Sequence, residues 1–327
     1  MKRITGLYEK IISIENLTEA DRMARKGKAK SYGVKLHDQN REQNILLLHQ
    51  LLKSGNFKTS EYSVFKIRDP KERLIYRLPY YPDRIIHWAI MLQLEPVWMS
   101  VFTRDTYSCI KGRGIHGTAK QLHKCLVSDQ RGTQYCLKID INKFYPSINH
   151  VILKRLIRRK IKDYRLLSLL DEIIDSAPGL PIGNYLSQFF ANLYLAYFDH
   201  WIKEIKKVMY YFRYCDDMIF LSESKPALHS LFSDINDCLN NQLDLVVKSN
   251  YQIFPVDKRG IDFVGYVFFH DHVMLRKSIK KNMMKKISLL NKRNITGIRR
   301  KIEIASYWGW IHQSYVSSKN LKRKVVA

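Results

Sequence analysis

The stretch YFRYCDDMIF, residues 211–220, constrains the fold more than any other part of the sequence, because two adjacent aspartates stand within an aromatic and apolar run. Neighbouring carboxylates repel each other and resist burial. The residues on either side are typical of β-strands, so we expect a hairpin with its tip at the two aspartates. An isolated aspartate pair is usually a solvated turn. Aromatic strands on both sides argue against a simple surface turn, so some other group must compensate the charge.

Strand and helix patterns alternate along the rest of the chain. A second hairpin is expected at 62–79 with its turn at Asp69-Pro70, and further strands are expected at 135–140 and 261–275. The spacing of apolar residues predicts helices at 41–54 (ended by Gly55), 83–102 (up to Pro96), 151–177 (in two parts), 188–207 (capped by Ser187), 228–243 and in the basic tail from Ser278. Because helices interleave with hairpins, an α+β fold is favoured over a doubly wound parallel sheet. The sequence has no P-loop or dinucleotide-binding glycine motif.

The charge of the chain points to a polyanionic partner. Lys and Arg number 56 against 30 Asp and Glu, which gives a formal charge of +26. Nucleic acid is the commonest partner of so basic a protein. Five cysteines form no CxxC pair, and their odd number favours free thiols in a reducing compartment. The apolar window 180–198 carries several polar residues and fits a core helix better than a membrane span, so we expect a cytoplasmic protein without membrane contact.

Asp140 ends the predicted strand YCLKID and joins Asp216 and Asp217 as a candidate site residue. All three carboxylates lie at strand ends, where they can reach a common point on one edge of a sheet. Clustered carboxylates either take up a proton or share a cation. Oxygen ligands suit Mg²⁺, and two such ions about 3.5–4 Å apart activate an attacking hydroxyl and stabilise a leaving pyrophosphate. The sequence therefore favours phosphoryl transfer on nucleic acid with two Mg²⁺ ions, for which Mn²⁺ is a substitute.

Three segments in this order resemble consecutive motifs of reverse transcriptases: DINKFYPSI from Asp140, GLPIGNYLSQFFANLYL from Gly179, and YCDD from Tyr214. The resemblance extends from the basic hairpin near residue 62 to the FVGY segment at 263–266, about two thirds of the chain. It implies a right-hand polymerase with an antiparallel palm sheet and a small helical thumb. The implied division is fingers with an N-terminal extension at 1–115 and 149–180, palm at 116–148 and 181–270, and thumb at 271–327.

The same resemblance assigns roles at the reaction centre. Asp140 and Asp216 are implied as the main metal ligands, with Asp217 beside them. Tyr145 falls where the family places an aromatic ring under the sugar, which excludes a 2′-hydroxyl; the alternative is a core tyrosine. Lys248 is a candidate proton donor to pyrophosphate, although the surrounding VVKSNY departs from the usual pattern.

Other roles follow for the substrate strands. Arg73 resembles the arginine that grips the triphosphate, and Lys66 and Lys71 compete for the companion lysine. Phe263, Gly265 and Tyr266 resemble the primer grip. Three further residues, Arg213, His87 and His116, are interpreted as structural or backbone-contacting and not as catalytic.

One departure from the family pattern indicates a subtype. Ile182 stands where most of the family has glutamine, and the motif ends in Ser187-Gln188 instead of Ser-Pro. Both features resemble reverse transcriptases of diversity-generating retroelements, which make adenine-mutagenic cDNA in prokaryotic or phage genomes. Isoleucine offers the substrate no hydrogen bond, and losing one such contact is worth about 1 kcal/mol, roughly fivefold in discrimination. Ile182 and Gln188 are therefore predicted to contact the substrate, with Ile182 contributing to low fidelity.

The resemblance implies template RNA, an RNA–DNA hybrid, dNTPs and a small basic oligomeric accessory protein as partners. Tyr307, Trp308 and Trp310 are candidates for that protein contact, but packing within the thumb is the favoured interpretation. Three alternatives stay open for the function. A retron or group II intron-like reverse transcriptase shares the catalytic residues, and an antiphage DNA polymerase ignores the template. An RNA-binding scaffold is expected to have lost an aspartate, whereas all three are present.

Overall fold

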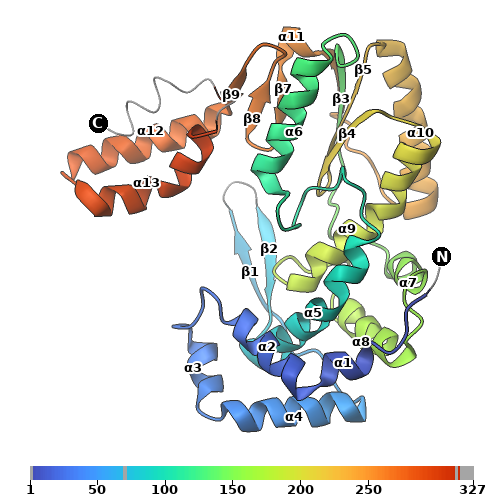
Figure 1. Ribbon diagram of the computed structural model, residues 1–327, viewed down its shortest axis with the longest axis vertical. Coiled ribbons are helices and arrows are strands. Elements are labelled where there is room, and N and C mark those ends of the chain that lie inside the picture. The colour runs from blue at the N-terminus through green and yellow to red at the C-terminus, as the bar shows by residue number, and fades with distance from the viewer. Residues whose placement is uncertain (1–2, 69–71, 314–315, 317–327) are drawn as a thin grey trace. The chain divides into compact units, whose positions relative to one another are not determined.

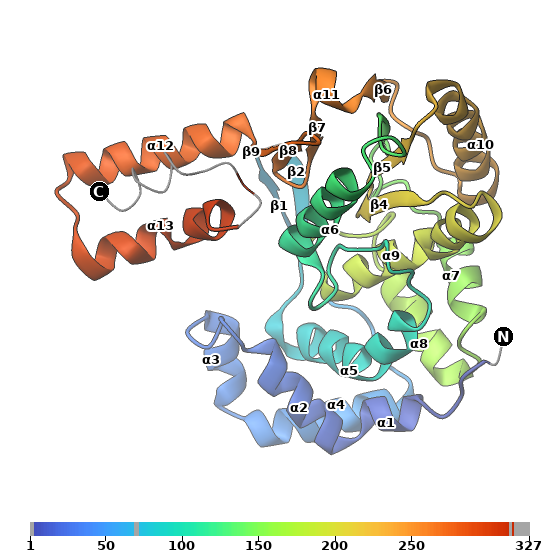
Figure 2. The same cartoon turned by 45° about the horizontal axis from the view of Figure 1, so that its top comes forward.

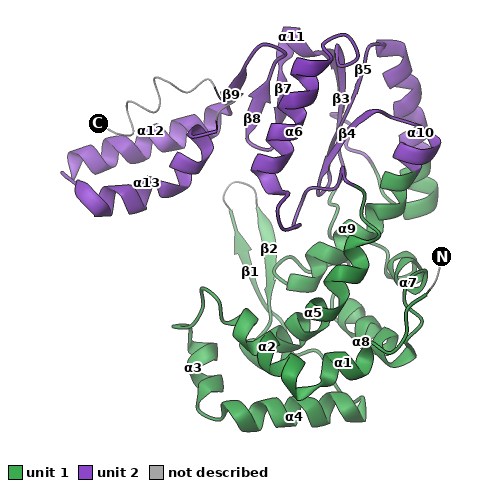
Figure 3. Ribbon diagram, viewed as in Figure 1, with its two compact units in different colours: residues 1–103, 142–200, 238–246 green, residues 104–141, 201–237, 247–327 purple. Residues whose placement is uncertain are grey.

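The structure is a computed structural model, and it describes residues 3–68, 72–313 and 316 (Figure 1). The chain crosses repeatedly between two structural units (Figure 3). Unit 1 comprises residues 1–103, 142–200 and 238–246, and unit 2 comprises residues 104–141, 201–237 and 247–327. Each unit has its own buried core and is described by itself.

Unit 1 is mainly helical. Its N-terminal helices are α1 (Tyr8–Ile12), α2 (Ile14–Ala24), α3 (Tyr32–Asp38) and α4 (Arg41–Ser54). A π-helical turn η1 (Tyr80–Arg84) leads into α5 (Ile85–Met99), and α7 (His150–Arg158), α8 (Tyr164–Asp175) and α9 (Tyr185–His200) follow. The prediction for 41–54 is confirmed, since α4 ends at Gly55 with a left-handed φ of 73° that glycine adopts without strain. The division of 151–177 into two helices is also confirmed.

Two predicted helix boundaries in unit 1 are wrong. Helix α5 does not end at Pro96 but continues to Met99, because Leu94 and Trp98 on either side of the proline are fully buried. Their burial offsets the hydrogen bond that proline cannot make. Ser187 does not cap α9: the helix begins at Tyr185, whose ring stacks on Trp88 at 4.3 Å, and Ser187 is buried inside it.

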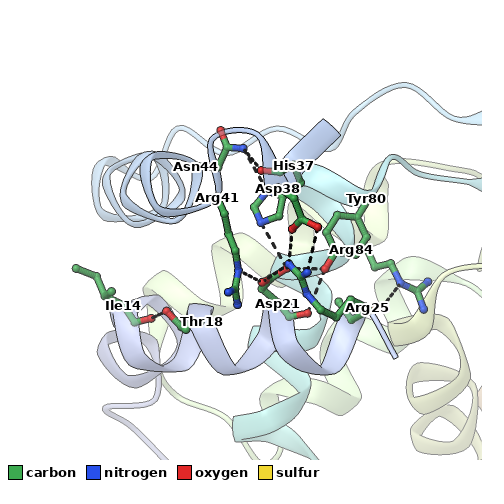
Figure 4. Close-up of polar contacts among 11 residues, drawn as sticks. Ile14, Thr18, Asp21, Arg25, His37, Asp38, Arg41, Asn44, Tyr80 and Arg84 are labelled. Atoms are coloured by element: carbon green, nitrogen blue, oxygen red, sulfur yellow. Dashed lines mark hydrogen bonds and ion pairs between the residues drawn. The ribbon is translucent and has the colours of Figure 1, made fainter. Parts of the chain in front are cut away.

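A buried aspartate joins the N-terminal helices (Figure 4). Asp21 of α2 has a fully buried side chain and accepts hydrogen bonds from Arg25 (Nη2 to Oδ2, 2.7 Å), Arg41 (Nε to Oδ2, 2.7 Å) and Tyr80 (Oη to Oδ1, 2.5 Å). His37 Nε2 lies 3.4 Å from Oδ1. Burial raises the pKa of Asp21, but the hydrogen bonds from these neighbours outweigh it and hold that pKa well below its usual range. One carboxylate thus connects α2, α3, α4 and η1.

The predicted basic hairpin also belongs to unit 1. Strands β1 (Ser63–Ile67) and β2 (Arg73–Arg77) pair antiparallel, with Ile67 opposite Arg73. The predicted turn at Asp69-Pro70 lies outside the described residues. Most side chains of the two strands are exposed, which suits a surface that meets another molecule more than a core.

Unit 2 is built on an antiparallel sheet of four strands in the order β4-β5-β3-β6. The strands are β3 (Tyr135–Asp140), β4 (Tyr210–Tyr214), β5 (Asp217–Ser222) and β6 (Gln252–Pro255), so the strand predicted at 135–140 is confirmed. Helix α6 (Gly114–Ser128) and the first part of α10 (Lys225–Leu243) flank this sheet on opposite sides (Figures 1 and 2). A short π-helical turn η2 (Trp201–Ile205) precedes β4 and replaces the predicted continuation of the helix to residue 207.

A second antiparallel sheet, in the order β7-β8-β9, follows in the chain. It consists of β7 (Ile261–Phe263), β8 (Tyr266–Phe268) and β9 (Val273–Leu275), and a short helix α11 (Val256–Arg259) precedes it. Two helices, α12 (Lys277–Lys292) and α13 (Gly297–Ile311), complete unit 2. Side chains of α6, both sheets, α12 and α13 share one buried apolar cluster, so these elements form one core. No helix in the described parts of the chain is both long and apolar enough to cross a membrane.

Candidate active site

Strand pairing brings the three predicted aspartates together in unit 2. Asp140, the last residue of β3, pairs with Asp217, the first residue of β5. Tyr214, the last residue of β4, also pairs with Asp217, which leaves Cys215 and Asp216 as a two-residue turn. The hairpin tip thus lies one residue earlier than the sequence predicted, and Cys215 takes a positive φ of 56°. The three carboxylates converge on one edge of the sheet.

Burial dominates the electrostatics of this edge. Burial and, to a smaller extent, the neighbouring charge of Asp140 together raise the pKa of Asp216 to about 6. Burial likewise raises the pKa of Asp217 to about 7, against the opposing effect of Lys138. Both carboxyl groups hold their protons more tightly than an ordinary aspartate because their charges are poorly compensated.

The carboxylates leave buried oxygen atoms unsatisfied. Among the described residues, Asp140 Oδ1 and Asp217 Oδ1 are buried without a hydrogen-bond partner. A buried polar atom without a partner is costly, and a hard cation would satisfy such oxygens. The donor set therefore fits a divalent metal ion. Nevertheless, no group of three or more His, Cys, Asp or Glu side chains in the described chain is arranged to enclose one.

Lys248 is one reason why the carboxylates are not arranged to enclose a cation. Its Nζ lies 2.6 Å from Asp140 Oδ2, and its backbone N–H donates to the Asp140 carbonyl at 2.9 Å. The ammonium group thus occupies the side of Asp140 that a cation would need. The sequence predicted Lys248 at this site, and the structure places it against the carboxylate.

Lys138 also lies at the candidate active site, although the sequence patterns did not predict it there. Its Nζ lies 3.6 Å from Asp217 Oδ2 and donates to the backbone carbonyl of Asp262 on β7. Arg276 Nε donates to the Asp262 carboxylate at 2.5 Å, and the Arg276 N–H donates to the Gly265 carbonyl at 3.0 Å. Residues two apart on a strand share a face, so the position of Lys138 before Asp140 was a usable signal.

Arg213 supports the turn formed by Cys215 and Asp216, which agrees with the structural role predicted for it. Its guanidinium is fully buried and donates from Nη1 to the Cys215 carbonyl at 3.1 Å and from Nη2 to Thr106 Oγ1 at 3.3 Å. The buried arginine therefore fixes the backbone directly before Asp216.

The predicted primer-grip residues form a tight hairpin. Phe263 pairs with Tyr266, which leaves Val264 and Gly265 in the turn with φ values of 42° and 90°. A side chain on Gly265 would collide with the ring of Trp310, so only glycine fits there. The Tyr266 hydroxyl donates to the Trp310 carbonyl at 3.1 Å and hydrogen-bonds His116 Nδ1 at 3.1 Å.

The α13 aromatic residues pack inside unit 2. Tyr307, Trp308 and Trp310 are partly buried against its apolar cluster. These aromatic residues thus pack against the chain itself, but Trp310 contacts His116 and Tyr266, so the packing is not confined to the predicted thumb at 271–327. His116 contacts Trp310 edge to face at 5.6 Å, which agrees with its predicted structural role.

The remaining predicted site residues lie in unit 1. Arg73 is exposed at the start of β2, and Lys66 on β1 forms an ion pair with Glu72 (2.9 Å) across the hairpin. Lys71 lies outside the described residues. Tyr145 is half-buried, packs edge to face on Phe144 at 5.6 Å, and its carbonyl accepts from the Leu180 N–H at 2.8 Å.

The segment with the unusual isoleucine is bound to the basic hairpin. The Ile182 carbonyl accepts from the Tyr76 N–H at 2.8 Å, which joins it to β2. At Gly183 (φ 126°) a side chain would collide with the Tyr76 carbonyl, so glycine permits this close approach. Ile182 is half-buried and Gln188 is exposed on α9.

His87 on α5 is a structural residue, as the sequence predicted. Its side chain is buried, and burial lowers its pKa to about 3, so the imidazole stays neutral.

Comparison with known proteins gives the family. The family described as "Reverse transcriptase (RNA-dependent DNA polymerase)" matches residues 67–268. This chain belongs to the reverse transcriptase family. Members of this family use divalent metal ions, which agrees with the carboxylate edge of unit 2. The right-hand polymerase fold, with its antiparallel sheets and helices, is thereby confirmed.

Curated relatives of this reverse transcriptase are distant. Protein YkfC of Escherichia coli (strain K12) is 23% identical over 260 residues, which cover 65% of this chain and 66% of that protein. Group II intron-encoded protein LtrA of Lactococcus lactis subsp. cremoris is 25% identical over 178 residues, which cover 50% of this chain and 29% of that protein. Homologues of the group II intron type are thus among its relatives, and the chain spans only part of their length.

A solved structure of telomerase from Candida albicans with a fragment of telomeric RNA resembles this reverse transcriptase in fold. It has a TM-score of 0.50 and 11% identity, and the match covers 75% of this chain and 52% of that one.

Proposed function

We propose that this chain is an RNA-directed DNA polymerase that extends a primer with dNTPs at the carboxylates of Asp140, Asp216 and Asp217. The observation that carries the proposal is the pairing of β3 with β5, which gathers these carboxylates and leaves buried oxygen atoms without partners among the described residues. Phosphoryl transfer depends mainly on positioning and charge stabilisation, which such a site can supply. The charge of +26 suits a nucleic-acid template.

Asp140 and Asp216 would hold two divalent cations, Mg²⁺ or in its place Mn²⁺, with Asp217 in support. When bound, such cations activate the primer hydroxyl and neutralise charge on the leaving pyrophosphate. Lys248 Nζ lies 2.6 Å from Asp140 Oδ2, so a cation held by that oxygen would have to displace the ammonium group. Its released ammonium group is then a proton donor for pyrophosphate.

The fingers and palm would hold the substrates around this centre. We infer that Arg73 and either Lys66 or Lys71 bind the triphosphate, and that Tyr145 packs under the sugar. Phe263, Gly265 and Tyr266 would position the primer terminus. The three-part division predicted from the sequence stays part of this proposal. The two structural units divide the chain differently: residues 104–115 lie in unit 2, and residues 142–148, 181–200 and 238–246 lie in unit 1.

For the subtype, we propose an error-prone enzyme of a diversity-generating retroelement, in the cytoplasm of a prokaryotic cell, with a small basic accessory protein as partner. Support comes from Ile182 and Gln188. The Ile182 backbone is fixed to β2 by its 2.8 Å hydrogen bond, so its apolar side chain has a defined position. A glutamine there would offer the substrate a hydrogen bond that isoleucine lacks.

A group II intron-like reverse transcriptase is the second candidate, because a group II intron-encoded protein is among the relatives. Both candidates copy RNA, so fidelity separates them. A polymerase that ignores the template would make products unrelated to it, and an RNA-binding scaffold would make no products.

Primer extension on an RNA template of mixed sequence, followed by sequencing of the cDNA, tests these proposals. We expect complementary cDNA with errors concentrated opposite adenine, and fewer such errors in Ile182→Gln. Accurate cDNA would favour the intron-like enzyme, and an unchanged error spectrum in Ile182→Gln would remove that residue from the explanation. Products unrelated to the template, or no products, would contradict RNA-directed synthesis.

A further inference from the structure

Two cysteines meet directly beside the catalytic turn. The segment before α6 runs alongside β4: Thr106 pairs with Arg213 in parallel, and the Tyr107 N–H donates to the Arg213 carbonyl at 3.1 Å. Continuing this register brings Ser108 and Cys109 next to Cys215. Residues far apart in the sequence thus place two thiols at one point of unit 2.

One hydroxyl group binds both thiols. Ser108 Oγ lies 2.7 Å from Cys215 Sγ and 3.2 Å from Cys109 Sγ. Because both sulfur atoms contact the same oxygen, they lie within about 6 Å of each other, and rotation of the two side chains would have to bring them to the ~2.05 Å of a disulfide.

Other features separate this pair from the rest of the cysteines. All five cysteines lie in described parts of the chain and are free thiols, but Cys136 and Cys238 are buried. Cys109 and Cys215 are both partly exposed, and both have positive φ values, 58° and 56°. Such backbone is uncommon outside glycine and often marks a functional position.

We propose that Cys109 and Cys215 form a modification site for two-electron thiol oxidants of the peroxide class, and that their disulfide inactivates the polymerase reversibly. In the first step the Cys109 thiolate attacks one peroxide oxygen, the O–O bond breaks, and the leaving oxygen takes up a proton as water. Cys109 is then a sulfenic acid. In the second step the Cys215 sulfur attacks the Cys109 sulfur, the S–O bond breaks, and the hydroxyl leaves with a proton as a second water.

The surroundings of Cys109 favour the first step. A hydrogen bond from Cys215 and a weaker one from Ser108 lower the pKa of the Cys109 thiol to about 6, against the effect of burial. A thiol with a lowered pKa and access to solvent is the kind that peroxides oxidise.

The disulfide would act on the turn that carries Asp216. Cys215 directly precedes Asp216, and Arg213 holds its carbonyl at 3.1 Å. Drawing the Cys215 sulfur toward Cys109 would break the bonds to Ser108 and rotate the turn. This consequence for activity rests on the proposed polymerase function, whereas formation of the disulfide does not.

Treating the full chain with hydrogen peroxide, followed by peptide mapping by mass spectrometry without reductant, tests the modification directly. We expect one cross-linked peptide pair joining Cys109 to Cys215, lost on adding dithiothreitol. Only sulfenic or higher acids at Cys109, or a different cysteine pair, would overturn the proposal. This readout needs no polymerase activity, so it fails independently of the proposed function.

Primer extension tests the consequence. Peroxide should remove most of the wild-type activity and dithiothreitol should restore it, while Cys109→Ser should keep its activity under peroxide. Cys125→Ser is the matched control, because Cys125 is also partly exposed and free but lies on α6; it should remain as sensitive as the wild type. Equal loss of activity in Cys109→Ser would contradict the proposed inactivation.

Discussion

Two buried aspartate sites in this reverse transcriptase illustrate opposite solutions to one physical problem. Asp21 in unit 1 is fully buried, and its contacts with His37, Tyr80 and two arginines hold its pKa low. Asp216 and Asp217 in unit 2 are half-buried, and their pKa values are raised to about 6 and about 7. A carboxylate whose oxygens are both satisfied by the protein serves the fold, whereas one that keeps a buried oxygen without a partner among the described residues, as Asp140 and Asp217 do, is available to a cation.

The largest effect on activity should come from removing the charge of Asp216 at the candidate active site. Asp216→Asn should lower the rate of nucleotide incorporation by about three orders of magnitude, roughly 4 kcal/mol, because it removes a proposed metal ligand. Its free energy of unfolding without metal should not fall, since an uncompensated buried charge disappears. Single-turnover primer extension and urea unfolding measure the two quantities. An active Asp216→Asn would contradict the assignment.

The reverse pattern is expected for Asp21→Asn. Removing this charge leaves Arg25 and Arg41 without their buried partner, which should cost about 3–5 kcal/mol of stability. Urea unfolding of the full chain measures the loss. Rates of nucleotide incorporation should stay near the wild-type value at temperatures where the variant is folded. A change of less than about 1 kcal/mol in the free energy of unfolding would show that the contacts of Asp21 are not a major support of the fold.

The raised pKa values predict how the metal-free protein responds to pH. Between the unfolded pKa near 4 and the folded values of about 6 and about 7, the folded state binds more protons than the unfolded state, so stability should fall as pH rises. At about 1.4 kcal/mol for each unit of pKa shift, the two groups predict a loss of up to about 5 kcal/mol between pH 4.5 and pH 8. Thermal unfolding with a chelator measures it, and Asp216→Asn combined with Asp217→Asn is the control that should flatten the profile. A rise over this range in the wild type but not in the control would contradict the prediction.

The smallest effect should come from Lys138, the partial partner of Asp217. Lys138→Met should raise the KM for primer–template severalfold, about 1 kcal/mol, because it removes the link between β3 and Asp262 on β7. Lys138→Arg should restore part of the affinity. Lys203→Met is a matched control, since Lys203 also pairs with an aspartate (Asp105, 3.8 Å) and donates to backbone carbonyls. An equal change in the control would reduce Lys138 to a general structural role.

Much of the catalytic site was predictable because it depends on local patterns. The YFRYCDDMIF stretch predicted its own hairpin, and YCLKID predicted the strand that delivers Asp140. The predicted helix boundaries were wrong where tertiary packing determines them. Burial of Trp98 extends α5 beyond Pro96, and stacking of Tyr185 on Trp88 lets α9 begin before Ser187. The contacts of Lys138 and the meeting of Cys109 with Cys215 depend on distant segments, and no local pattern encodes them.

A titration with Mn²⁺, followed by electron paramagnetic resonance, tests most directly whether the unsatisfied carboxylates form the cation site. The full chain should bind Mn²⁺, Asp21→Asn should bind it equally well, and Asp140→Asn combined with Asp216→Asn should lose that binding. Unchanged binding in the double variant would contradict the account, because the metal would then be held elsewhere.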